Sequence, residues 1–456
     1  MVRQHLRFFS LFTLAALALR LFLVWRFPAV TSDSYVYGDI AKNWLQHGIY
    51  GLSGINDISP TAIRLPGYPA FLAAVFAIFG MEHYRTAILL QVFVDVATCF
   101  LIADLARRLL SDRAAKAAFA LAAFCPFLAN YSAAALTETW EIFFTVVALD
   151  FAVIGLDSDR LRPWVGCGLA IAAAILLRPD GGLLLASLEL YLLVVFLRRN
   201  RRTPPTASLG RWLRTSAILA MASLAPLVPW TLRNLYTLHE FQPLAPRYSE
   251  ESGEFVPMGF NRWVRTWMAD YVSVEDIFWK VPGDPIPLDK LPSRAFDSPP
   301  QQQETAQLIA DYNQVLQVTP ELDARFTKLA AERVQYAPLR YYFILPAVRI
   351  TDMWLRPRTE ILPSNSRWWE FDDGAPGLVI MIIFGLLNIL YAAGALFGLA
   401  RGGFSATVNP LLTFAILRSL FLGTLENPEP RYTLECYPVL IVLAAALWSR
   451  AAKQSS

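Results

Sequence analysis

The chain has 456 residues, of which 55% are hydrophobic and 17% are charged, and its formal net charge is +3. Soluble domains carry about 25% charged residues, so this composition excludes a water-soluble globule, and it equally excludes intrinsic disorder. The small net charge argues against a nucleic-acid partner. The composition is therefore that of a polytopic protein embedded in the lipid bilayer.

Long apolar segments recur along most of the chain, and a membrane-spanning helix needs about 20 mostly apolar residues. The segments that satisfy this are 6–27, 86–109, 114–131, 136–156, 163–178, 181–198, 212–232, 376–399, 405–423 and 432–449. Two further apolar stretches, 67–80 and 339–355, would disturb the orientation if they spanned, so we expect helices at the membrane interface. The predicted fold class is an all-α membrane protein with about ten to twelve transmembrane helices.

Basic residues gather in alternate loops, which sets the expected orientation. The most basic loops contain Arg107, Arg108, Arg113, Arg160, Arg162, Arg198, Arg199, Arg211 and Arg214. By the positive-inside rule these loops and both termini are cytoplasmic. The first apolar segment has a basic start, but no small-x-small cleavage site follows it, so we expect a retained helix rather than a signal peptide.

Two large loops are then extracytoplasmic, and they divide the chain into three predicted parts. Residues 1–232 form an N-terminal transmembrane module that includes the first outer loop, 28–85. Residues 233–375 form a small outer domain with an interfacial helix, because this stretch far exceeds an ordinary connection and contains helical apolar spacing. Residues 376–456 form the C-terminal transmembrane helices.

The first outer loop carries a carboxylate directly after the first span. Asp33 stands in Ser32-Asp33-Ser34-Tyr35, where water meets lipid, and partial desolvation can tune the basicity of a carboxylate there. Asp33 is therefore a candidate general base. Its position alone favours another role, that of N-cap of the following helix, because Ser and Asp are common N-caps.

Acidic residues also fall within the predicted spans, where ionisable groups are rare and are usually functional or paired. They are Asp95, Asp104, Glu138, Glu141 and Glu189. Glu138 is level with Asp33, and Glu141 lies one turn further along the same helix face. For the other three acids we expect structural pairing with Arg178, Arg431 or backbone donors.

Four arginines lie near the same outer level: Arg64, Arg178, Arg233 and Arg431. Each alone resembles an interfacial anchor, but several guanidinium forks at one depth suit phosphate recognition. The chain has four histidines and four cysteines. Neither shows close metal-ligand spacing, so we assign no metal site and no cofactor, although a divalent metal held by histidine and carboxylate stays open.

The order of these motifs resembles the GT-C superfamily of integral-membrane glycosyltransferases, especially protein O-mannosyltransferases and lipid A aminoarabinose transferases. The motifs are Asp33 after the first span, Arg64-x-Pro-Gly-Tyr-Pro, Gln91, Thr137-Glu138, Arg178-Pro179, Pro229-Trp230-x-x-Arg233-Asn234 and Glu429-x-Arg431-Tyr432. The resemblance implies a GT-C-type bundle with interfacial helices. It also implies inverting transfer of a sugar from a polyprenyl-phosphate carrier to a protein, lipid or glycan acceptor, at the outer face of the inner or plasma membrane.

The resemblance also implies roles for individual residues. The catalytic acids would be Asp33 and Glu138, and Arg64 would lie near the donor phosphate. The other arginines of the motifs, Arg178, Arg233 and Arg431, are further candidates for holding that phosphate. The candidates for substrate binding are Tyr35, Tyr68 and Tyr432. Some relatives have adjacent Asp and Glu at the first position, whereas Ser34 follows Asp33 here, so no role that needs two adjacent acids is expected.

Two other functions share these features. A transporter or flippase of a lipid-linked glycan would also have a helical bundle with buried acids and arginines, but the large outer loop and the lack of an internal repeat favour a transferase. A ligase or polymerase of the O-antigen type would use a diphosphate-linked donor instead.

Overall fold

The structure is a computed structural model that describes residues 3–158, 160–200, 208–248, 254–370, 374–402 and 409–449. Parts of the predicted outer loop 233–375 and of the predicted span 405–423 lie outside these ranges. The described residues are helical almost throughout, and their sheet is a single two-stranded hairpin. The predicted all-α class is therefore confirmed.

Two compact units make up the chain. The first contains Met1–Glu254, Leu390–Leu417 and Leu434–Ser456, and the second contains Phe255–Ile389 and Arg418–Thr433. Helices α17 (Gly374–Arg401) and α18 (Asn409–Gly423) contribute residues to both.

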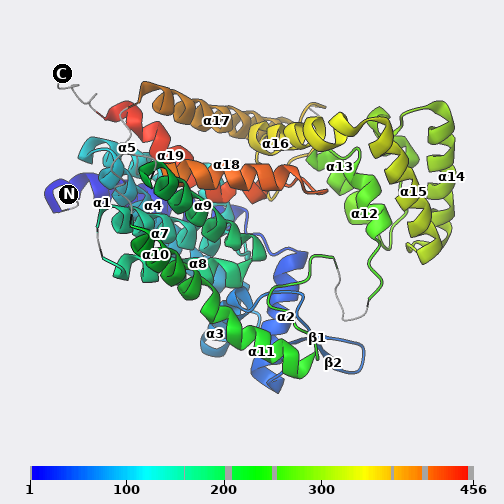
Figure 1. Ribbon diagram of the computed structural model, residues 1–456, viewed down its shortest axis with the longest axis horizontal. Helices are drawn as coiled ribbons and strands as arrows, with labels where there is room; N and C mark the ends of the chain where they lie inside the picture. Colours follow the sequence, from blue (N-terminus) through cyan, green and yellow to red (C-terminus); the bar gives the residue numbers. More distant parts are fainter. Residues whose placement is uncertain are drawn as a thin grey trace. The chain divides into compact units, whose positions relative to one another are not determined.

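The first unit is a helical bundle with an outer segment at one end. Its bundle helices are α1 (Leu6–Arg26), α4 (Tyr84–Leu109), α5 (Asp112–Ala123), α6 (Pro126–Ser132), α7 (Glu138–Asp157), α8 (Arg162–Leu177), α9 (Gly182–Asn200), α10 (Leu209–Leu224), α11 (Val228–Thr237) and α19 (Tyr437–Ala445). The outer segment contains α2 (Ser32–His47), β1 (Gly51–Ser53), β2 (Ile58–Pro60) and α3 (Gly67–Phe79). In Figure 1, α2, α3, α11 and the hairpin gather at one end of this unit, while α5 and α19 lie at the other.

The predicted spans all correspond to helices, but their lengths differ. Within the described ranges, seven helices are long and apolar enough to cross a membrane, and the pair α5 and α6, bent by 51°, makes an eighth. Pro126 begins α6 and cannot donate the backbone hydrogen bond that would continue α5, which accounts for the bend. The predicted spans 163–178 and 405–423 are the shorter helices α8 and α18, of 16 and 15 residues.

The first outer loop folds onto the bundle through an aromatic core. Helix α3 has 13 residues, or about 20 Å, which is too short to span and agrees with the interfacial helix expected there. Its Tyr68 and Leu72 are fully buried and pack with Tyr37 and Ala41 of α2. This packing fixes the start of α2 relative to the loop that precedes α3.

The second unit has a core of its own. Its helices are α12 (Met258–Arg265), α13 (Tyr271–Asp276), α14 (Pro299–Val315), α15 (Pro320–Tyr336) and α16 (Leu345–Leu355). Trp263, Trp267, Tyr312 and Phe326 are fully buried at its centre. The helical apolar spacing predicted within 233–375 includes that of the two helices α14 and α15, and Leu316 separates them because it adopts a left-handed conformation and ends α14.

Candidate functional site

Asp33 lies in the first turn of α2 but does not cap it. The N-cap is Thr31, whose side chain forms a reciprocal capping box with Ser34, and the Thr31 amide donates to the Ser34 hydroxyl at 3.0 Å. The interpretation of Asp33 as the cap is therefore wrong. Its carboxylate instead accepts a hydrogen bond from the Arg64 guanidinium, with 2.8 Å between Oδ1 and Nη2.

Arg64 approaches Asp33 from the loop before α3. Both side chains are 29% exposed, and the Arg64 guanidinium carbon lies 5.6 Å from the centre of the Tyr37 ring. Gly67 makes the path of this loop possible, because a Cβ atom there would stand 2.6 Å from the Leu176 carbonyl oxygen. The absence of a side chain at Gly67 thus lets the Arg64 loop pack directly against the end of α8.

A second charged cluster forms where α7 begins and α8 ends. Arg178, the C-cap of α8, lies 3.6 Å from Glu138, 3.7 Å from Glu141 and 3.2 Å from Asp180, measured between nitrogen and carboxylate oxygen. Glu138 and Glu141 are each 1% exposed, whereas Arg178 is 19% exposed. One partly accessible guanidinium therefore lies within ion-pair distance of two buried carboxylates and of Asp180.

Backbone hydrogen bonds join the chain segments that precede the two clusters. The Ala29 amide donates to the Ala133 carbonyl, and the Ala135 amide donates to the Ala29 carbonyl, both at 2.9 Å. These bonds hold the segment that leads to Asp33 beside the segment that leads to Glu138.

Tyr37 lies within electrostatic reach of both clusters. Burial, together with smaller opposing effects of Arg64 and Asp33 and then of Arg178 and Glu138, raises the pKa of Tyr37 to about 12. Its hydroxyl is therefore neutral at physiological pH. Sequence reasoning missed Tyr37, although its position four residues after Asp33 places both on one face of a helix.

The two predicted tyrosines of the first unit have different surroundings. Tyr68 is fully buried and donates to the Gln91 side chain at 2.7 Å, and Gln91 donates to the Ala134 carbonyl at 2.7 Å. This chain of bonds positions the segment before Glu138. Tyr35 is 60% exposed and packs edge-on against Tyr84.

Arg233 holds the first outer loop against α11. It donates to the carbonyl oxygens of Thr61 at 2.8 Å and Tyr50 at 2.5 Å, and its guanidinium lies over the rings of Tyr50 and Trp230. Beside it is a cavity of about 460 Å³, whose lining includes Trp44, Tyr50, Trp230 and Arg233. An aromatic cavity of this kind offers flat apolar faces next to hydrogen-bonding groups, as binding sites for small molecules do.

Arg431 and Tyr432 belong to the second unit and share one carboxylate. Glu429 accepts from the Arg431 Nε at 2.6 Å and from the Tyr432 hydroxyl at 2.6 Å. Glu429 is 4% exposed, and Arg431 is 21% exposed. The Glu429-x-Arg431-Tyr432 motif is thus a compact network formed by neighbours in sequence.

The acids expected to be structural include two with clear partners. Asp95 pairs with Arg20 at 2.5 Å inside the bundle, and both side chains are almost fully buried. Asp104 pairs with Arg107 and Arg108. Structural pairing is confirmed for these two acids, but with partners from α1 and α4 rather than with Arg178 or Arg431.

Metal ligands do not converge in the part of the chain that the structure describes. There, no group of three or more His, Cys, Asp or Glu side chains is arranged to hold an ion. The charged side chains of the site form ion pairs with one another, Asp33 with Arg64 and Glu138 with Arg178.

A family comparison matches the part of the chain that contains most of this site. Residues 61–230 match the model of the dolichyl-phosphate-mannose-protein mannosyltransferases. This range includes Arg64, Glu138 and Arg178. No curated protein matches the chain.

Solved structures with a similar arrangement of helices include an oligosaccharyltransferase from Archaeoglobus fulgidus. Its form tethered to an acceptor peptide containing the NVT sequon has 16% sequence identity and a TM-score of 0.52, over 97% of this chain and 49% of that one. Its complex with Zn and sulfate has 12% identity and a TM-score of 0.51, over 96% and 48%. This chain therefore spans about half the length of that enzyme.

The ArnT from Cupriavidus metallidurans bound to undecaprenyl phosphate has 17% identity and a TM-score of 0.40, over 96% of this chain and 77% of that one. The family match and the fold together confirm the resemblance to the GT-C glycosyltransferases and the integral-membrane class.

Proposed function

We propose that the protein transfers a sugar from a polyprenyl-phosphate donor to an acceptor hydroxyl at the extracytoplasmic face of the inner or plasma membrane. The observation that carries this proposal is the Asp33–Arg64 ion pair, which lies where the outer loops bring the Arg178 cluster close. A partly exposed carboxylate beside guanidinium groups supplies the two chemical functions that such a transfer needs.

The first function is removal of a proton. The acceptor oxygen attacks the anomeric carbon, the bond from that carbon to the phosphate oxygen breaks, and the acceptor loses its proton. Asp33 takes this proton or orients the hydroxyl for attack, because a carboxylate held at the surface can accept a hydrogen bond from it. Direct attack from the face opposite the phosphate inverts the configuration of the anomeric carbon.

The second function is stabilisation of the leaving phosphate. Arg64 and Arg178 are partly exposed, and a guanidinium fork can bind a phosphate through two parallel hydrogen bonds. A donor phosphate bound to Arg64 competes with Asp33 for the same guanidinium. Donor binding would thus free the Asp33 carboxylate to receive the acceptor hydroxyl.

The remaining candidates have supporting roles in this proposal. Arg233 and Tyr68 position the outer loops, since their polar atoms bind neighbouring protein groups. Tyr35 is exposed beside Asp33 and is available to an acceptor. Glu138 holds Arg178 in place. Arg431 and Tyr432 stay predicted contacts to donor and substrate.

A reconstituted assay tests this proposal and separates it from transport. The full chain in liposomes receives a synthetic polyprenyl-phosphate donor with a labelled sugar, together with membrane extract as the source of acceptors. We expect a labelled glycosidic product and an equal amount of free polyprenyl phosphate. Asp33→Asn should lose both, while Asp57→Asn, an exposed carboxylate in the same loop, should keep them. Movement of intact donor across the bilayer without a new glycosidic bond would instead establish a flippase.

A further inference from the structure

A second cleft lies at the opposite end of the bundle from the candidate site. It is formed by the end of α7, the start of α8, the end of α9 and the start of α10, and has a volume of about 800 Å³. Helix α7 begins at Glu138 and has 20 residues, which places the cleft ~30 Å away along that helix. This end carries the basic loops that are predicted to be cytoplasmic.

The lining of this cleft is strongly basic. It includes Arg160, Arg199, Arg211 and Arg214, and the described lining residues include no aspartate or glutamate. Two acids are adjacent to these lining residues in sequence: Asp157 is exposed at the end of α7, and Asp159 lies outside the described residues. The start of α10 adds the positive end of a helix dipole, and the Ser208 hydroxyl accepts from the Arg211 amide there. The cleft is therefore suited to an anion.

Two buried donors also line the cleft. The Trp212 indole Nε1 and the Ser158 hydroxyl are buried, and neither has a hydrogen-bond partner among the described residues. The Trp212 ring is fixed by stacking on Phe196, with 5.0 Å between ring centres. A buried donor without a partner is costly, so a ligand that brings acceptor oxygens to this position would satisfy both.

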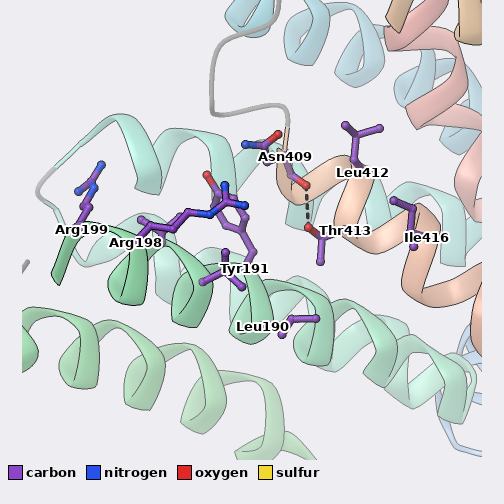
Figure 2. Close-up of a pocket in the computed structure, with 10 residues that line it drawn as sticks. Leu190, Tyr191, Arg198, Arg199, Asn409, Leu412, Thr413 and Ile416 are labelled. Carbon is purple, nitrogen blue, oxygen red and sulfur yellow. Dashed lines mark hydrogen bonds between the residues drawn. The ribbon is translucent and has the colours of Figure 1, made fainter. Parts of the chain in front are cut away.

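An apolar groove continues from the cleft. Figure 2 shows this groove, of about 580 Å³, between α9 and α18, with Arg198, Arg199 and Asn409 toward one end and Leu412 and Ile416 toward the other. The groove and the cleft share lining residues Tyr191, Val195 and Arg199. A ligand that fills both must have an anionic head and an apolar tail.

We propose that this cleft binds the phosphodiester head group of an anionic membrane lipid, with one acyl chain in the groove beside α18. Each guanidinium group can bind two phosphate oxygens through parallel hydrogen bonds, and the Trp212 indole and the Ser158 hydroxyl supply two further donors. The groove argues for a lipid over a soluble phosphate, which would leave the apolar surface unfilled. Basic pockets between helices on this side of a membrane are suited to such head groups.

Lipid binding by the purified full chain tests this proposal. Delipidated protein in neutral detergent micelles is titrated with phosphatidylglycerol or phosphatidylcholine, and retained lipid is counted by native mass spectrometry. We expect phosphatidylglycerol to bind at least about 10-fold more tightly, through charge-assisted hydrogen bonds. The combined Arg199→Ala and Arg211→Ala variant should lose this preference. Arg113→Ala, an exposed arginine at the start of α5, should retain it.

Two further measurements keep the proposal testable if the double alanine variant does not fold. The Arg199→Lys and Arg211→Lys variant keeps the charge but loses the fork, and Trp212→Phe keeps the ring but loses the N–H donor. Each should weaken phosphatidylglycerol binding several-fold, and Trp212→Phe by about 10-fold. An unchanged preference in all these variants would overturn the assignment. If excess inorganic phosphate displaced the lipid, the natural ligand of the cleft would be a soluble anion, and the proposal of a lipid ligand would be overturned.

Discussion

Replacing Asp33 by Asn should separate activity from stability, because the expected effect on the transfer rate is much larger than the expected effect on folding. Asp33 and Arg64 are joined by one contact of 2.8 Å, and both side chains are 29% exposed. Solvent screens an ion pair at this exposure, and such pairs contribute about 0–1 kcal/mol to stability. Asp33→Asn should therefore lower the free energy of unfolding by about 1 kcal/mol at most.

The expected loss of activity is much larger. A residue that accepts a proton in the transition state contributes about 10²–10⁴-fold to the rate, which corresponds to about 3–5 kcal/mol. The asparagine side chain has nearly the same size as aspartate and can still form hydrogen bonds with neighbouring groups, but it cannot accept a proton from the acceptor hydroxyl. The two effects differ enough to be measured on the same preparation.

The assay is a double-mutant cycle with Asp33→Asn, Arg64→Gln and the combination. Thermal unfolding in mild detergent reports the coupling in stability, and the initial rate of sugar transfer in liposomes reports the coupling in activity. If both residues act in one transfer step, the combined variant should be little slower than the slower single variant. A near-normal rate for Asp33→Asn, or a loss of stability above about 3 kcal/mol, would refute a catalytic role for this carboxylate.

Three other changes test the surroundings of the site. Glu138→Gln removes one buried partner of Arg178, so it should lower the free energy of unfolding by about 1–3 kcal/mol and also slow transfer; an unchanged unfolding temperature would contradict this. Arg233→Ala removes the bonds to the Thr61 and Tyr50 carbonyls and should increase hydrogen exchange across residues 50–61, whereas equal exchange would show that the loop is held elsewhere. Burial raises the pKa of Glu360 above its usual value, so this carboxyl holds its proton more tightly in the folded second unit than in the unfolded chain. The protonated carboxyl therefore contributes to the free energy of unfolding below pH about 4.5, and this contribution is lost as the pH rises through the folded pKa. Glu360→Gln should therefore unfold at a higher temperature than the wild type at neutral pH and show less pH dependence, and an identical pH profile would refute this.

Much of the architecture could be predicted because it depends on local composition. The apolar segments all form helices, since about 20 apolar residues in sequence satisfy their own backbone only as a helix in lipid. The helix at 67–80 was also predicted correctly. The exact number of spans stays a prediction. Within the described residues seven helices, or eight if the bent pair is counted, are long enough to span, because Pro126 bends one segment and α8 has 16 residues.

The site was harder to predict because its chemistry depends on partners. Asp33 was identified from its depth, but only the fold shows that Thr31 and Ser34 form the cap and leave Asp33 for Arg64. Arg20 was overlooked because a cation inside an apolar segment becomes meaningful only with its partner Asp95, 75 residues away. Depth can be read from the sequence, whereas pairing over long separations requires the fold.

Pairing also distinguishes arginines that the sequence leaves equivalent. Arg233 donates to backbone carbonyls, and releasing them for a phosphate would leave those carbonyls unsatisfied and detach the outer loop. Arg64 donates to Asp33 and Arg178 donates to Asp180. All four side chains are partly exposed, so one anion can be exchanged for another there without moving the backbone. Exchange of this kind is what binding and release of a lipid phosphate would require in the proposed reaction. The nature of each arginine's partner, more than its charge or depth, therefore favours Arg64 and Arg178 as the groups that meet the donor.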